Sequence, residues 1–136
     1  ATANAVSDNV IVSPISCASI LSMLAYGARD RTEVVLKKGL NFNKDDNVQK
    51  MGLRALTQEL NGSRKTRFRG AQLKLANKIF LAHEINVKSD YQQLADDVFK
   101  SSIENVDFSN SEEASEKINS WCDQQTDSKI KKMVSK

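Results

Sequence analysis

Apolar and polar residues follow two different periods along the chain, and the first segment changes from one to the other. Residues 10–12 form a short β-branched run that ends at Ser13 and Pro14. Because serine caps helices and proline is favoured in the first helical turn, we expect a strand over 10–12 and then a helix capped by Ser13. Residues 15–25 are apolar or small on nearly every face, which predicts a helix buried all round and ended by Gly27.

Residues 32–40 have the spacing of a short amphipathic helix. Residues 34–36, Val-Val-Leu, form its inward side, and the two lysines that follow lie outward. Glycine and asparagine favour the left-handed conformation that ends a helix, so Gly39 or Asn41 closes it. The sequence therefore predicts a helix that turns its valines towards the core.

A third helix follows and is capped by Asp46 or Asn47. Its apolar residues recur at spacings of three or four, and they are Val48, Met51, Ala55, Leu56 and Leu60. Basic side chains, among them Lys50 and Arg54, then share the opposite face. The helix is expected to stop at Asn61.

Residues 73–81 alternate between leucine or isoleucine and other side chains, which predicts a strand with at least one buried face. Asn77 falls on the leucine face, so its amide has to be hydrogen-bonded and is a candidate for a structural network inside the fold. Residues 91–99 fit one helical face, and residues 102–108 form a second strand. Strand, helix and strand at this spacing predict a parallel pair joined by a crossover helix.

Ser109 and Glu112 form a capping box that opens the last predicted helix. Its narrow apolar stripe consists of Ala114, Ile118, Trp121 and Cys122. Such a helix is expected to lie flat on another surface. No further strand follows before Lys136, and a parallel sheet of two strands is not stable alone. The elements therefore predict an α+β fold in which residues 1–136 are part of a single domain and incomplete as an independent one.

The composition is that of a soluble globular protein, with 40% apolar and 27% charged residues among 136. A formal charge of +3 is too small to imply nucleic-acid binding, and no apolar run is long enough to span a membrane. Cys17 and Cys122 lack the spacing of a zinc site or disulfide scaffold, so both are expected to be free thiols. His83 is the only histidine, and no Gly-x-Ser-x-Gly turn accompanies it. We therefore expect no enzyme, metal or cofactor.

The densest charge lies in a loop between the third helix and the first long strand. Its four cations are Arg64, Lys65, Arg67 and Arg69, and Lys50 and Arg54 flank them upstream. Such a row suits a linear polyanion, so a heparin-like glycosaminoglycan is the candidate ligand, and the alternative is a solvated loop that only aids solubility. Asn61 opens a glycosylation sequon, Asn-Gly-Ser, beside this loop. A glycan there supports secretion but would hinder a large polyanion.

Four motifs occur in one order along the chain. They are NVIVSPIS at residues 9–16, LKLANKIFLA at 73–82, SSIENVDF at 101–108 and INSWCDQQTDSKI at 118–130. Together they resemble the N-terminal portion of a serpin, from about the end of helix A through helix F. The resemblance implies the serpin fold, here with helices B to F, the last strand of sheet B and the first two strands of sheet A.

This resemblance implies an inhibitor of serine proteases whose reactive loop is cleaved and then inserts as a new strand into sheet A. The loop has no counterpart in residues 1–136, so the inhibitory chemistry lies outside them. The implied partners are a serine protease, the remainder of the serpin chain and a glycosaminoglycan, with no membrane or nucleic acid. We expect a secreted, extracellular protein, although free cysteines leave an intracellular serpin open. The alternatives are a non-inhibitory carrier, storage protein or chaperone, and an inactive fragment.

The resemblance also implies which residues control the conformation. Ser13 and Ser16 match serines beneath sheet A, where it parts to admit the loop, and Asn77 matches a buried asparagine on the neighbouring strand. Asn119 and Trp121 belong to the helix that lies across sheet A and has to yield during insertion. From local chemistry alone, Ser13 and Ser16 only cap and pack a helix start, and Trp121 is an anchor in a packed interface.

Overall fold

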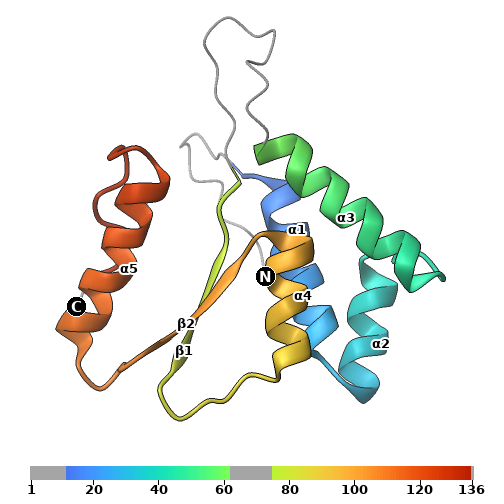
Figure 1. The fold of residues 1–136 in the computed structure, drawn as a ribbon, viewed down its shortest axis with the longest axis horizontal. Helices are drawn as coiled ribbons and strands as arrows, with labels where there is room; N and C mark the ends of the chain where they lie inside the picture. Colours follow the sequence, from blue (N-terminus) through green and yellow to red (C-terminus); the bar gives the residue numbers. More distant parts are fainter. Residues whose placement is uncertain (1–11, 62–74, 136) are drawn as a thin grey trace, which may run out of the picture.

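A computed structural model describes residues 12–61 and 75–135, which form five helices and two strands (Figure 1). The helices are α1 Pro14–Gly27, α2 Asp30–Gly39, α3 Asp46–Asn61, α4 Ser89–Phe99 and α5 Ser111–Gln125. The strands are β1 Lys78–Ala82 and β2 Ser102–Val106. The strand expected over 10–12 falls mostly outside the described residues, and Val12 itself is not in a strand.

The two strands pair in parallel, and α4 makes the crossover between them. Their register runs from Lys78 opposite Ser102 to Ala82 opposite Val106. The predicted unit of strand, helix and strand is therefore confirmed. Residues 75–77 belong to the predicted first strand but are not paired, because β2 offers partners to β1 only from Ser102 onward.

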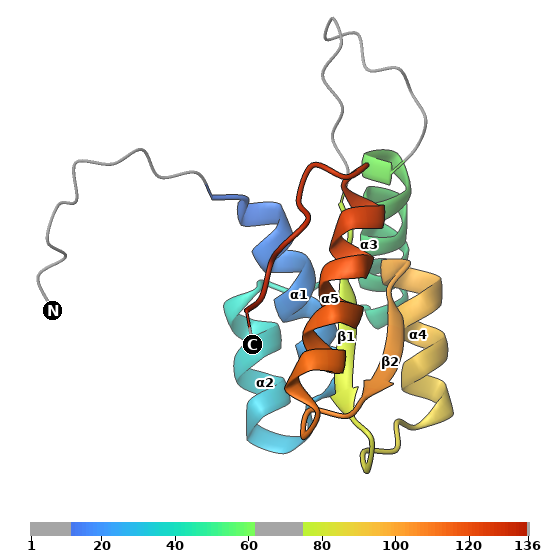
Figure 2. The same ribbon diagram turned by 90° about the vertical axis from the view of Figure 1, so that its left-hand side faces the viewer.

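The sheet separates two layers of helices (Figures 1 and 2). Helix α5 covers one face, whereas α1 and α4 lie behind the other face with α2 and α3 beyond them. The core lies in the rear layer, where Met23, Val98 and Phe99 are buried together. The side chains that pack against this cluster are Tyr26, Leu53, Ile79 and Leu94. They come from α1, α3, β1 and α4, so the rear layer is the one that holds β1 in place.

Helix α1 is buried on one side only, contrary to the prediction that it is buried all round. Met23 and three small residues are buried, whereas Ile20 and Leu24 are 47% and 54% exposed. Small residues suit the buried side because α1 approaches α4 closely, and the Tyr91 hydroxyl of α4 donates to the Met23 carbonyl at 3.0 Å. A Cβ on Gly27 would lie 3.1 Å from the Tyr91 ring, so this approach favours glycine there.

The predicted inward faces of α2 and α3 are largely wrong. Val34 of α2 is 65% exposed and Met51 of α3 is 58% exposed. Helix α3 instead turns Leu53 and Thr57 inward, and the buried Thr57 hydroxyl donates to the Leu53 carbonyl at 2.9 Å. Apolar side chains occur in more than one row of α3, and packing against α4 selects the row with Leu53. The exposed residues among those predicted to face inward are Val34, Val35, Val48, Met51, Ala55 and Leu56.

The cap of α1 agrees with the prediction, and the cap of α3 does not. Ser13 caps α1, where its Oγ accepts a hydrogen bond from the Ser16 N–H at 3.4 Å. Helix α3 is capped by Asp45, whose Oδ1 accepts from the N–H groups of Asn47 and Val48. The helix therefore begins at Asp46, with its cap one residue before the predicted positions.

The cap of α5 lies one residue later than the predicted capping box. Asn110 Oδ1 accepts from the Glu113 N–H at 3.3 Å, and Asn110 Nδ2 donates to the Glu113 carboxylate at 3.1 Å. The Ser109 hydroxyl is engaged elsewhere, because it donates to Asp107 Oδ1 at 2.6 Å. Asn110 and Glu113 thus take the places predicted for Ser109 and Glu112.

Both cysteines are free, as predicted. Cys122 is buried in α5, whereas Cys17 is exposed on α1, so only Cys122 packs as a small core residue. Within residues 12–61 and 75–135, no helix combines the length and the apolar character that crossing a membrane requires. The same part of the chain contains no group of three or more His, Cys, Asp or Glu side chains that could hold a metal ion.

Candidate functional site

Asn77 connects the helix behind the sheet to both strands. Its Nδ2 donates to Ser19 Oγ of α1 at 3.2 Å, and its carbonyl accepts from Ser101 Oγ, next to β2, at 2.9 Å. Ser19 is buried, and Ser101 is only 1% exposed. Because buried polar groups need partners, these bonds stabilise one relative position of α1, β1 and the start of β2. The Asn77 amide is hydrogen-bonded, as predicted.

Ser13 and Ser16 are one turn or more away from this network, at the start of α1. Within the described residues, no hydrogen bond joins either of them to Asn77, and Ser19 occupies that position instead. Ser19 was missed by sequence reasoning, although a signal was present. Ser16 and Ser19 are three residues apart, which places them on neighbouring turns of one side of the helix.

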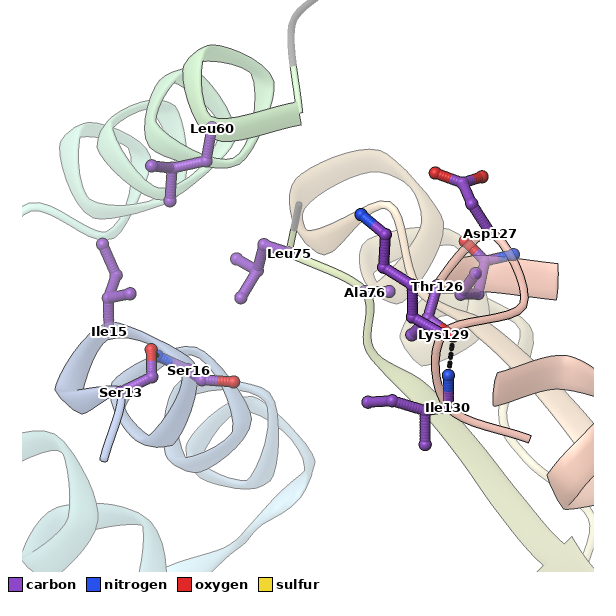
Figure 3. Close-up of a pocket in the computed structure, with 11 residues that line it drawn as sticks. Ser13, Ile15, Ser16, Leu60, Leu75, Ala76, Thr126, Asp127, Lys129 and Ile130 are labelled. Atoms are coloured by element: carbon purple, nitrogen blue, oxygen red, sulfur yellow. Dashed lines mark hydrogen bonds between the residues drawn. The ribbon is translucent and has the colours of Figure 1, made fainter. Parts of the chain in front are cut away.

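Ser13 and Ser16 instead line a pocket of about 470 Å³ (Figure 3). Helix α1 and the end of α3 form one side, Leu75 leads towards β1, and the turn after α5 forms the other side. In that turn, Thr126 Oγ1 accepts from the Ile130 N–H at 2.9 Å. The two serines therefore lie at the end of the sheet, beside the chain that enters β1.

Trp121 attaches α5 to the sheet. Its ring meets Phe80 of β1 edge to face, with the ring centroids 6.0 Å apart. Beside this contact, the Glu104 carboxylate of β2 accepts from Lys78 Nζ of β1 at 2.5 Å and lies 3.9 Å from Lys117 Nζ of α5. The hydrogen bond from Lys78 holds the pKa of the Glu104 carboxyl below its ordinary value. The Trp121–Phe80 ring contact and the ion pairs of Glu104 thus connect the front face of the sheet with α5.

Asn119 holds the chain that follows α5. Its Oδ1 accepts from the N–H groups of Met133 at 2.7 Å and Val134 at 3.0 Å, and its Nδ2 donates to the Val134 carbonyl at 3.0 Å. The exit segment, residues 126–135, therefore runs back along the helix (Figure 2). Of the two residues predicted on this helix, Trp121 contacts the sheet and Asn119 contacts the exit segment.

The basic candidates are described only in part. Lys50 Nζ pairs with Asp46 at 2.7 Å and lies 5.4 Å from the centroid of the Tyr26 ring. Arg54 is exposed on α3, and its Nε donates to the Asp97 carbonyl at 3.3 Å. The candidates that lie outside the described residues are Arg64, Lys65, Arg67 and Arg69.

The sequon residue Asn61 ends α3 and is exposed, whereas the rest of its sequon lies outside the described residues. Its Oδ1 accepts from the Leu75 N–H at 2.9 Å. A glycan is attached through the side-chain nitrogen of asparagine, so this hydrogen bond through oxygen is compatible with one. Asn61 therefore stays a candidate acceptor.

The arrangement of the five helices around the parallel pair occurs in solved serpin structures. Serpin48 of the insect Tenebrio molitor superposes with a TM-score of 0.78 at 29% sequence identity, covering 93% of this chain and 33% of that one. Emu ovalbumin superposes with a TM-score of 0.73 at 30% identity, covering 93% and 35%. The fold is thus the N-terminal part of the serpin fold, an α+β architecture.

The sequence comparisons extend this result to the whole chain. Residues 1–136 match the family model described as Serpin (serine protease inhibitor). The chain is 34% identical over 129 residues to serine protease inhibitor 42Dd of Drosophila melanogaster, an alignment that covers 93% of this chain and 33% of that protein. The chain belongs to the serpin family, whose members are generally inhibitors of serine proteases rather than enzymes. It spans about a third of the length of the relatives it matches.

Proposed function

We propose that this chain is part of an inhibitor of serine-type endopeptidases, which traps its target by inserting a cleaved reactive loop into the sheet. Membership of the family supports the inhibitory class, and the name of the Drosophila relative states it for that protein. Among the described strands, β1 pairs with β2, and in this proposal the rest of the sheet comes from chain outside residues 1–136. In this proposal the loop is contributed by chain outside residues 1–136.

The observation that carries the proposal is the hydrogen bonding of Asn77, next to β1. A strand that enters the sheet has to shift the existing strands relative to the helices behind them. The bonds from Asn77 to Ser19 and Ser101 join these elements, which supports the proposal that they control that shift. Ser13 and Ser16 line the pocket at the end of the sheet, and we assign them a supporting role in holding the start of α1.

Incubation of the complete serpin that carries this chain with trypsin-, chymotrypsin- and elastase-type proteases tests the proposal. We expect a covalent complex that survives SDS with at least one protease, and none when the active-site serine of that protease is blocked. Cleavage by the whole panel without any such complex would contradict the proposal. That outcome would favour a non-inhibitory serpin, an alternative kept open by emu ovalbumin, whose name states no inhibition.

As a second function, we propose that the region around the end of α3 binds a heparin-like glycosaminoglycan. The supporting observation is Arg54, which is exposed on α3, the helix that leads in sequence to the four cations of residues 64–69. Lys50 is expected to contribute less, because Asp46 already pairs with it. Recognition rests on repeated negative charge, so binding should weaken as salt rises.

Heparin-affinity chromatography tests this second function. Replacing the four loop cations with alanine should lower the salt at which the protein elutes. The matched control replaces four lysines elsewhere in the chain, namely Lys38, Lys88, Lys131 and Lys132. Arg54→Ala should also lower the elution salt more than Lys50→Ala does. If the two fourfold variants elute together, the loop is not the binding site.

We further propose that the protein is secreted and carries a glycan on Asn61. Support comes from the exposed position of Asn61 and from its sequon. Mass spectrometry of protein from secreting cells should find the glycan, and Asn61→Gln should remove it. Because the glycan would stand beside the basic loop, the variant should elute from heparin at higher salt. An unmodified Asn61 in secreted protein would contradict the proposal.

A further inference from the structure

Helix α5 lies along one face of the sheet, apart from the other four described helices (Figures 1 and 2). The rear helices α1 and α4, in contrast, pack closely and share the buried core. The Asn119 hydrogen bonds fasten the exit segment to α5. Helix α5 and residues 126–135 therefore form one unit, which we name the α5 flap. Its buried residues are Ala114, Ser115 and Cys122.

The aromatic and ionic contacts between the flap and the sheet form one compact patch. Lys117 and Trp121 are four residues apart on α5, so they lie on one face of the helix. Lys78 and Phe80 are two residues apart on β1, so they point to the same face of the sheet. Glu104 lies opposite Phe80 in the parallel register and completes the patch.

The ionic half of this patch depends on Glu104. The Lys78 side chain is 13% exposed, and its Nζ lies 5.2 Å from the centroid of the Phe80 ring. Glu104 forms an ion pair with Lys78 and also lies 3.9 Å from Lys117 Nζ. Lys117 in turn lies 4.0 Å from Glu113 of α5. A nearly buried ammonium is costly without a counter-charge, whereas it regains water if the flap lifts. The negative charge of Glu104 therefore stabilises the docked flap over the lifted one.

We propose that Glu104 is a charge clamp that holds the α5 flap on the sheet and sets how often the flap detaches. The clamp neutralises Lys78 beneath the flap and attracts Lys117 from the flap itself. Trp121 supplies the apolar half of the contact through the Phe80 ring, and this half does not depend on charge. The clamp goes beyond the proposed function. Only its further consequence, that flap release sets the rate of loop insertion, rests on that function.

Hydrogen–deuterium exchange of the complete serpin tests the clamp. Glu104→Gln keeps the size of the side chain but leaves Lys78 uncompensated, so the amides of α5 should exchange about tenfold faster. Adding Lys78→Met removes the stranded charge, and the double variant should return towards wild-type exchange in α5. Glu116→Gln is the matched control, because Glu116 is an exposed acid on the same helix. This control should leave exchange in α5 unchanged.

Two results would overturn the clamp. One is exchange in α5 that is the same in Glu104→Gln as in Glu116→Gln. The other is a double variant that exchanges as fast as Glu104→Gln, since the effect would then not arise from Lys78. If Glu104→Gln does not fold, Lys117→Met decides. This variant removes the contact from the flap side, so it should raise the exchange rate of the α5 amides by less than Glu104→Gln would. An unchanged exchange rate would contradict the clamp.

Protease trapping by the same variants separates the clamp from the proposed function. Faster exchange in Glu104→Gln together with no trapping by any variant, wild type included, would confirm the clamp and contradict the inhibitory function. Trapping by wild type together with unaltered exchange in Glu104→Gln would support the inhibitory function and contradict the clamp. If both hold, Glu104→Gln should change the rate of loop insertion and the Lys78→Met addition should restore it.

Discussion

At the scale of single residues, the Asn77 amide links α1 to the chain that enters β1. A buried polar group without a partner is costly, and Asn77 Nδ2 donates to Ser19 Oγ, 58 residues away in the sequence. The bond therefore stabilises the position of α1 against β1.

Asn77→Ala should lower the free energy of unfolding of the complete serpin by about 1–3 kcal/mol, because the buried Ser19 hydroxyl loses its partner. Thermal and chemical denaturation measure this change, and Gln92→Ala, at an exposed position of α4, is the control. A double-mutant cycle with Ser19→Ala should show coupling between the two sites. Strictly additive effects, or no loss of stability in Asn77→Ala, would show that the bond does not contribute.

Lys100→Gly should stabilise the protein. Lys100 follows α4 in the left-handed conformation, with φ 51° and ψ 38°, and its N–H is bonded to the carbonyls of Ala95 and Asp96. Glycine adopts this conformation without the strain that a Cβ brings, which is worth about 1 kcal/mol. The melting temperature should rise. Asp96→Gly, inside the helix, should lower stability by about 1 kcal/mol, so a fall in both variants would contradict the interpretation.

At the scale of elements, helices and strands could be predicted from sequence far better than their faces. The predicted α4 matches in extent and in buried side chains, because Ala95, Val98 and Phe99 form a single apolar row. Helix α3 has more than one such row, so its periodicity predicts a helix without specifying which side packs. The approach of α4 decides between them, and this is a tertiary effect.

Acidification should release the α5 flap through Glu104. Lys78 of the sheet and, to a smaller extent, Lys117 of the flap lower the pKa of the Glu104 carboxyl from its ordinary 4.5. The carboxylate therefore attracts the flap above that pH. The contribution is lost as pH falls below about 4.5 and through the lowered pKa. The charged groups that face this carboxylate are Lys78 of β1 and Lys117 of α5. Lys117 also pairs with Glu113 of its own helix.

Exchange in α5, compared between wild type and Glu104→Gln at each pH, measures this acid release. Because the intrinsic exchange rate changes equally in both proteins, their ratio reports docking alone. The two should differ at neutral pH and converge as the carboxyl is protonated. A ratio that stays constant down to about pH 3 would exclude Glu104 as the acid-sensitive group.

At the scale of the whole molecule, the described residues enclose only a small core. The buried cluster of Met23, Val98 and Phe99 is small. Large apolar side chains on three helices are exposed, and they include Ile20, Leu24, Val34 and Met51. Sequence reasoning predicted an incomplete domain from the two-stranded sheet. It did not predict which helix faces stay uncovered, because those faces depend on packing.

Residues 1–136 produced alone should therefore lack cooperative unfolding. A two-stranded sheet and a small core leave little free energy to offset the entropy of ordering the chain, and the exposed apolar faces should bind the dye ANS. Circular dichroism should show a broad thermal transition. Co-production with the remaining polypeptide of the serpin should abolish dye binding and sharpen the transition, since the uncovered faces of α1, α2 and α3 would then be packed. A monomer that unfolds sharply without binding the dye would show that the rear layer is stable by itself, and the exposed side chains would then need another explanation.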